Sequence, residues 1–248
     1  MSLDPVALCV DANDPMVLAR FWAEALRWRV ADGADDDDDE VSLVPTDDTS
    51  FQLLFIREPA PRTGLGRLHL DLTTTSLDDQ SATVDTLIGR GGSHLDVGQR
   101  PEEGHVVLAD PEGNEFCIIE PTNNFLATCP RLGAVSCDGT HAVGEFWASA
   151  LGWPLIWDQD GETAVRAPDL TGSIISWGGE PVKSKPPRNR LHLDLAPSVG
   201  GDRSAEVESL IGLGASRADV TRRYPAHHAN HVTMVDPDGN EFCVLPPR

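Results

Sequence analysis

Two short segments decide the fold of this sequence, because each of them occurs twice. LHLDL at residues 68–72 returns at residues 191–195, and DPEGNEFCII at residues 110–119 returns as DPDGNEFCVL at residues 236–245. The copies lie 123 and 126 residues apart. A nearly constant period of this length indicates a duplicated chain rather than a chance similarity.

A third repeated segment extends the period toward the N-terminus of each half. FWAEALRW at residues 21–28 returns as FWASALGW at residues 146–153. The period therefore divides the 248 residues into two domains of ordinary size, which we place at residues 1–124 and 125–248. The segment around residues 122–130 is the expected link between them.

The amino-acid composition argues against some classes of binding partner. Forty acidic and nineteen basic residues give a formal net charge of −21, which argues against nucleic acid and anionic membranes as partners. No apolar run approaches the roughly 18 residues of a membrane span. The five cysteines form no CxxC pair, as is typical of reduced thiols. We expect a soluble, cytoplasmic protein. The sequence leaves open whether the protein forms a homodimer.

Each half shows the same order of local patterns. A short β-prone run, such as 6–10, leads into a helix that opens at Asp14 and Pro15, a good N-cap pair. Strand-like pieces follow, and then a second unit begins with 68–72 and a helix over 78–89. The chain therefore reads as four βαβββ modules of the α+β class. We expect the modules to pair within each half, so that each half encloses a cleft between its sheets.

The Phe-Trp helix, the following Leu151-Gly152-Trp153 and the DPxGNEF hairpin resemble the vicinal oxygen chelate superfamily. This superfamily includes glyoxalase I, extradiol dioxygenases and bleomycin-resistance proteins, and the similarity is greatest to its glyoxalase-like members. The resemblance covers nearly the whole chain and implies two tandem glyoxalase-like domains. It does not imply one reaction, because this scaffold serves isomerases, lyases, dioxygenases and binding proteins.

The alternation of side chains along a strand predicts which residues face the cleft. The leucines of LHLDL should face the helices, and the residues between them should face the cleft. The same argument applies to NEFC in each hairpin. The predicted cleft residues are His69, Asp71, Glu115 and Cys117 in the first half, and His192, Asp194, Glu241 and Cys243 in the second.

Metal-dependent relatives hold a divalent metal with four strand positions, usually His or Glu. Only His69 and His192 match such a position with confidence, while Cys117 and Cys243 stand where the closing-strand glutamate is usual. A catalytic site needs about three protein ligands and an open position. We therefore expect no fully assembled metal site. A zinc site of His69 with Cys117 and Asp71 or Glu115 is the chemical alternative.

Two further sets of residues are candidates for ligand contact. His105 and His231 each precede the turn aspartate by five residues, where an imidazole could contact a ligand or transfer a proton. The alternative for both is a strand-end histidine without such a role. Trp22 and Trp147 fall on apolar helix faces and should be core. Trp157 and Trp177 occur only in the second half and could form an aromatic cleft wall.

These patterns favour a protein that binds or transforms a small molecule in a cleft, without a complete metal site. The alternative is a divalent-metal lyase or isomerase with an unusual ligand set centred on His69 and His192. A structural module without a small ligand would explain the fold, but it would not explain the polar pairs repeated on the cleft face.

Overall fold

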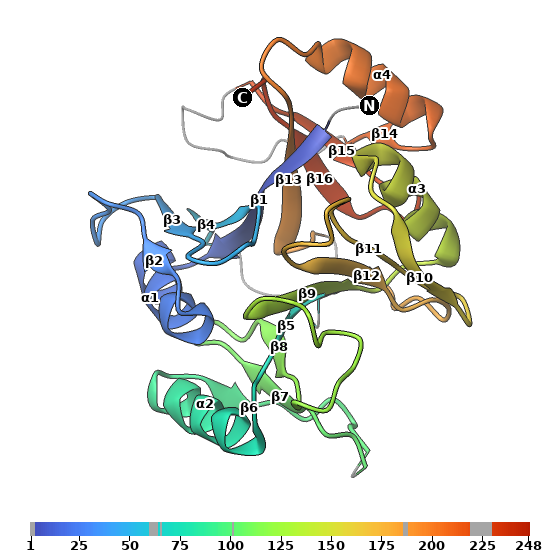
Figure 1. The fold of residues 1–248 in the computed structure, drawn as a ribbon. Helices are drawn as coiled ribbons and strands as arrows, with labels where there is room; N and C mark the ends of the chain where they lie inside the picture. The colour runs from blue at the N-terminus through green and yellow to red at the C-terminus, as the bar shows by residue number, and fades with distance from the viewer. Residues whose placement is uncertain (1–2, 60–63, 65, 101, 186–187, 219–229) are drawn as a thin grey trace.

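The computed structural model describes residues 3–59, 64, 66–100, 102–185, 188–218 and 230–248. Within them the chain forms four modules, each a strand, a helix and three more strands (Figure 1). The elements of the first half are β1 (Leu3–Ala12), α1 (Pro15–Leu26), β2 (Arg29–Val30), β3 (Glu40–Val44), β4 (Gln52–Arg57), β5 (Leu68–Leu72), α2 (Leu77–Gly89), β6 (Ser93–His94), β7 (Val106–Ala109) and β8 (Glu115–Ile118).

The second half repeats this order. Its elements are β9 (Leu132–Cys137), α3 (His141–Leu151), β10 (Leu155–Gln159), β11 (Glu162–Val165), β12 (Ile174–Trp177), β13 (Leu191–Pro197), α4 (Arg203–Gly212), β14 (Ser216–Arg217), β15 (Val232–Val235) and β16 (Glu241–Val244). The predicted α+β class and the four βαβββ modules are confirmed.

The strands form two eight-stranded sheets, and each sheet joins one module from each half. Sheet A has the order β14-β15-β16-β13-β1-β4-β3-β2, and sheet B has the order β10-β11-β12-β9-β5-β8-β7-β6. The junctions are the antiparallel pairs β1–β13 and β5–β9. The expectation that each half encloses its own cleft between paired sheets is therefore wrong. Both pairings bury the same leucines of LHLDL, so the repeat alone does not distinguish them.

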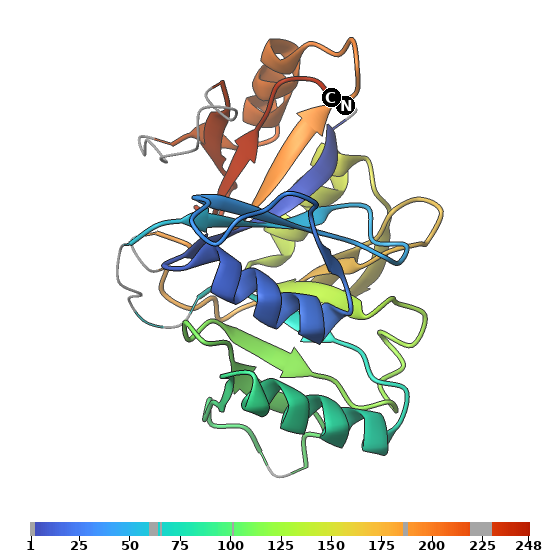
Figure 2. The ribbon, with the colours of Figure 1, turned by 90° about the vertical axis from the view of Figure 1, so that its left-hand side faces the viewer.

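Helices cover one face of each sheet, and the core lies there. α1 packs on β3 and β4 of sheet A, and it also contacts sheet B through Phe116 on β8. The ring centroids of Trp22 and Phe116 are 5.0 Å apart, and those of Trp147 and Phe242 are likewise 5.0 Å apart. Figure 2 shows α1 between the two sheets, with α2 on the outside. The two modules of the first half thus meet through α1, whereas the two halves meet through the strand pairs β1–β13 and β5–β9 and through a contact of α3 with β1.

Hydrogen bonds explain why the Phe-Trp pair and the DPxGNEF turn recur together. Trp22 Nε1 donates to Oδ2 of the turn residue Asp110 at 3.1 Å, and Trp147 Nε1 donates to Asp236 at 3.2 Å. Both tryptophans are buried, as expected from their helix face. The next acidic residue of the first turn, Glu112, accepts the backbone N–H of Asp14 at the start of α1. Each hairpin therefore caps and anchors the helix of the preceding module.

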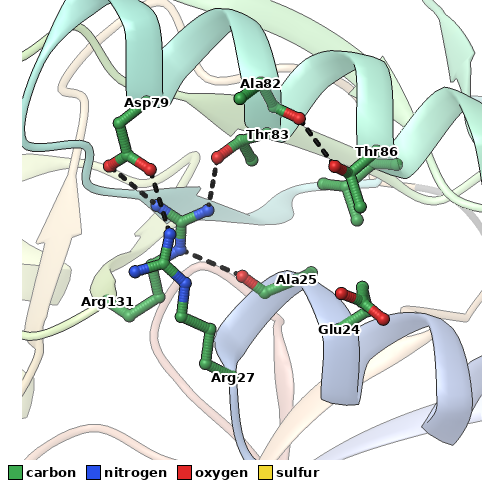
Figure 3. Close-up of a pocket in the computed structure, with 9 residues that line it drawn as sticks. Glu24, Ala25, Arg27, Asp79, Ala82, Thr83, Thr86 and Arg131 are labelled. Atoms are coloured by element: carbon green, nitrogen blue, oxygen red, sulfur yellow. Dashed lines mark hydrogen bonds and ion pairs between the residues drawn. The ribbon is translucent and has the colours of Figure 1, made fainter.

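Arg131, in the link between the halves, fastens the two helices of the first half to each other. Its guanidinium donates to Ala25 O on α1 at 3.0 Å and to Thr83 Oγ1 on α2 at 2.9 Å. Arg27 reaches the same place and donates to Asp79 at 2.9 Å (Figure 3). These groups line a small cavity of about 140 Å³ between α1 and α2. Hydrogen bonds to two main-chain oxygens and to the Thr83 hydroxyl hold the arginine, which makes this a structural junction.

Five consecutive aspartates, residues 35–39, lie in the loop between β2 and β3. Asp36 pairs with Arg20 at 2.7 Å, and Asp39 pairs with Arg57 at 2.7 Å. None of the helices that the structure describes has both the length and the apolar character required to cross a bilayer.

Candidate ligand-binding cleft

A cavity of about 410 Å³ opens at sheet B, lined by residues of β5, β9, β10, β11 and β12, of their flanking turns and of the link between the halves. Residues of both halves form its wall, because sheet B itself joins the halves. The lining residues are His69, Phe125, Ser136, Cys137, Asp138, Trp157, Glu162, Thr163, Ser176, Trp177 and Gly178. The size is typical of a site for a small organic ligand.

Polar side chains meet at the floor of this cavity because the strand register aligns them. His69 lies opposite Ser136 across the β5–β9 junction, and Asp71 lies beside Cys117 on β8. Ser136 Oγ donates to Asp71 Oδ2 at 2.5 Å, and His69 Nε2 lies 3.5 Å from Asp71 Oδ1. Asp71 therefore holds a hydroxyl on one side and an imidazole on the other.

These polar groups differ in exposure. The His69 side chain is 34% exposed, whereas Asp71 is 14% exposed. Burial and the neighbouring Asp71 carboxylate raise the pKa of the Cys117 thiol far above its ordinary value. Cys117 is consequently a neutral thiol in this environment, and His69 is the group that a ligand can reach.

Aromatic side chains form another part of the cavity lining. Phe125 from the inter-half link and Trp157 from the edge strand β10 contact edge to face, with ring centroids 5.7 Å apart. Both are partly exposed, at 38% and 36%. Trp177 is buried behind them and stacks on Trp147. The predicted aromatic wall of Trp157 and Trp177 thus adjoins the cavity, and Phe125 completes it.

The link packs over part of the same sheet face. Leu126 is buried in a cluster with Val107, Cys117, Ala134 and Ile174, which all lie on the cavity side of sheet B. The chain has one such link, so the duplication does not supply an equivalent segment for sheet A.

A related constellation lies on the corresponding face of sheet A. Cys9 occupies the register position opposite His192 that Ser136 occupies opposite His69. Cys9 Sγ donates to Asp194 Oδ2 at 3.1 Å, and His192 Nε2 lies 3.4 Å from Asp194 Oδ1. All three residues are fully buried or nearly so. The two halves therefore repeat one hydrogen-bonded arrangement, with an accessible imidazole only at His69.

The other predicted site residues serve different contacts. Glu115 accepts the backbone N–H of Gly66 at 2.5 Å, and Glu241 accepts from Lys185 Nζ at 2.8 Å. The main-chain oxygen of His105 accepts from the Gln99 side chain. His231 immediately precedes β15, and Cys243 lies beside Asp194 in the register. None of these five lines the cavity described above.

Sequence reasoning missed several residues of the wall. Ser136 and Ser176 face the cavity from β9 and β12, and strand alternation applied to those strands would have found them. The same reasoning on β1 would have found Cys9. Phe125, Asp138 and Glu162 lie at or beyond strand ends, where no periodicity marks them.

Among the residues that the structure describes, two groups have the donor atoms for a divalent metal. His69, Asp71 and Cys117 form one group, and Cys9, His192 and Asp194 form the other, with the ligand atoms of each group within 4.8 Å of one another. One imidazole, one carboxylate and one thiolate are a chemically suitable set for zinc, and three ligands leave a position open. The first group fits this requirement better because it borders the cavity.

Comparisons with known proteins agree with the fold. Two segments, residues 7–119 and 134–245, match the family described as glyoxalase-like domain. Since these segments make up most of the chain, the protein belongs to the glyoxalase-like family of the vicinal oxygen chelate superfamily. No functionally curated protein is similar enough in sequence to match it.

Solved structures show the same arrangement over the full length. Glyoxalase I from Zea mays superposes with a TM-score of 0.65 at 15% identity, covering 99% of this chain and 92% of the maize chain. A putative dioxygenase from Bacillus subtilis superposes with a TM-score of 0.63 at 13% identity, covering 98% and 84%. At this level of identity the likeness shows a shared fold. The function has to be argued from the residues of the cavity.

Proposed function

We propose that this protein binds a small organic molecule in the cavity of sheet B. The observation that carries the proposal is a cavity of about 410 Å³ whose lining combines the partly exposed rings of Phe125 and Trp157 with the accessible imidazole of His69. Exposed aromatic rings beside a few polar groups are typical of small-ligand sites. Among the lining groups, His69 is a partly exposed imidazole held by Asp71, and we expect it to contact the ligand.

His69 would orient the ligand or exchange a proton with it. Asp71 faces the imidazole from below, and Ser136 fixes the carboxylate through a short hydrogen bond. A histidine held by a carboxylate is a suitable general acid or base near neutral pH. Any chemistry in this cavity would therefore use His69 as the proton-transferring group and Asp71 as its positioning residue.

Tryptophan fluorescence tests the binding proposal. A panel of metabolites and antibiotics should contain compounds that quench the emission, and Trp157→Phe should remove most of the quenching. Trp28→Phe is the matched control, because Trp28 is buried in the first module and bonded to Asp47. If quenching survives Trp157→Phe but is lost with Trp28→Phe, the ligand binds elsewhere and the proposal is wrong.

A divalent-metal lyase or isomerase is the second candidate, favoured by the convergence of His69, Asp71 and Cys117. A metal bound there would supply Lewis-acid activation of a ligand oxygen. Elemental analysis after zinc, nickel, manganese or iron addition tests it. Stoichiometric metal that is lost in His69→Ala and retained in His192→Ala would support this candidate, and no bound metal after any addition would exclude it.

A further inference from the structure

The charged groups of the cavity wall are acidic. Asp138 and Glu162 line the cavity, and Asp71 lies just beneath His69. No lysine or arginine occurs among the described lining residues. Lys183 lies beside the wall and pairs with Asp138, its Nζ at 3.2 Å from Oδ2. This single pairing leaves Glu162 and Asp71 to set a negative potential in the cavity.

The aromatic wall, like the acidic groups, favours a positively charged ligand. The π faces of tryptophan and phenylalanine attract cations within about 6 Å of the ring centroid. Trp157 and Phe125 are partly exposed, and their edge-to-face contact directs one ring face away from the other ring. A cation beside these rings would gain from the quadrupole and from the carboxylates together.

The duplicated half provides an internal comparison. Ser176 of sheet B corresponds in register to Leu54 of sheet A, because each lies beside the residue that faces the histidine. On sheet A the equivalent face carries the apolar cluster of Ala7, Cys9, Leu54 and Ile56. Within the part of the chain that the structure describes, sheet A repeats the histidine and the aspartate but has Leu54 in place of Ser176 and no counterpart of the Phe125–Trp157 pair on this face.

From these observations we infer that the ligand is an aromatic molecule carrying a positive charge, such as an aryl-alkyl amine or amidine. The positive group would lie near the rings of Trp157 and Phe125 and near the carboxylates of Glu162 and Asp138, where it would compete with Lys183 for Asp138. The ring of the ligand would pack against the same aromatic wall. This inference rests on the proposed small-molecule site and adds the chemical class of its occupant.

Three naphthalene probes that differ mainly in charge test the inference. 1-Naphthylmethylamine is cationic near neutral pH, 1-naphthylacetamide is neutral and 1-naphthylacetate is anionic. Calorimetric titration should give an amine affinity about tenfold or more above that of the acetate, with the amide between them. Equal or tighter binding of the acetate would overturn the inference, even though it would leave a small-molecule site in place.

Single substitutions locate the charge preference. Glu162→Gln should weaken amine binding about three- to tenfold and leave amide binding unchanged, because only the charge is removed. Glu208→Gln on α4 removes the same charge from a distant exposed side chain, so it should change neither affinity. An equal effect of both variants would mean that the amine responds only to the net charge of −21, which would overturn the inference.

Trp157→Ala separates the inference from the underlying site. It should weaken all three probes, because each loses the aromatic wall. If Trp157→Ala weakens the probes while Glu162→Gln and Asp138→Asn do not alter the preference among them, the cavity binds aromatics but the charge assignment is wrong. If no probe binds the wild-type protein at millimolar concentration, the assigned ligand class is wrong, and the fluorescence panel alone decides the proposed function.

Discussion

Trp22 on α1 donates a hydrogen bond of 3.1 Å to Asp110 in the β7–β8 turn, which ties the first module to the second. Burial raises the pKa of Asp110, against the hydrogen bonds from Asn114 and Trp22 that lower it. Trp22→Phe should lower the free energy of unfolding by about 1–3 kcal/mol, because the buried carboxyl group loses a donor. Urea unfolding measures the loss.

A double-mutant cycle isolates this hydrogen bond. Trp22→Phe and Asp110→Asn should be non-additive by about 1 kcal/mol or more, as expected for two directly bonded residues. Additive effects would show that the indole contributes only through its packing against Phe116.

Arg131 should be important for stability although it lies in the link. Its side chain is only 10% exposed, and it donates to two main-chain oxygens and to Thr83. Arg131→Ala should cost about 2–4 kcal/mol, because it leaves buried acceptors without a donor. Arg131→Lys should recover only part of the lost free energy of unfolding, since an ammonium group does not reproduce the planar arrangement of the guanidinium N–H donors.

Arg90 supplies the control for this experiment. It pairs with Glu24 at 2.9 Å, but its side chain is 62% exposed. Arg90→Ala should therefore change thermal or urea stability by less than about 0.5 kcal/mol. A similar loss in both variants would contradict the structural role assigned to Arg131.

Asp79 should make the α1–α2 junction sensitive to acid. Burial alone raises the pKa of Asp79, but hydrogen bonds from Thr75 and the charges of Arg131 and Arg27 outweigh it and lower the pKa. Ionised Asp79 therefore stabilises the fold above its unfolded pKa of about 3.9, and the contribution is lost as pH falls through the lower folded pKa.

The comparison of wild type with Asp79→Asn tests this direction. At pH 7 the variant should be less stable by about 1–2 kcal/mol, the usual contribution of hydrogen bonds to a charged group. The difference should shrink as urea midpoints are measured at decreasing pH below about 4. A gap that widens in acid would contradict the lowered pKa.

Cys9 and Ser136 should be exchangeable within limits, because they hold equivalent positions next to a buried aspartate. Cys9→Ser should alter unfolding free energy by less than about 1.5 kcal/mol, since the hydroxyl can donate to Asp194 as Ser136 donates to Asp71. Cys9→Ala should cost more than Cys9→Ser, because it leaves the buried carboxylate without that donor. The reverse order in chemical denaturation would argue against the equivalence of the two sites.

Much of the fold follows from the sequence because periodicity and repetition are local properties. The alternation in LHLDL placed the leucines toward the helices, and Leu70 and Leu72 are indeed buried in the main core. The pairing of modules was not predictable in the same way. β5 meets β9 rather than β1, yet either junction would bury similar residues, so the choice depends on tertiary geometry and on the short link.

The site was predictable only where it lies on strands. Alternation brought His69, Asp71 and Cys117 to one face, and the structure places them within ligand distance of one another. Phe125 and Glu162 were not predicted as site residues, because side-chain alternation does not extend to a link or to the end of a strand. The internal repeat implied two equal clefts, but of the two repeated histidines His69 is accessible and His192 is buried.

Because strands of the two halves pair with each other, the link between residues 122 and 130 joins two units that also share both sheets. The polypeptide is covalently one chain, but its sheets are joined as two protomers of a dimer would be, through β1–β13 and β5–β9. His69 comes from one half and Trp157 from the other. A molecule held between them would act as a clamp, so that ligand occupancy and the cohesion of the two halves become a single linked equilibrium.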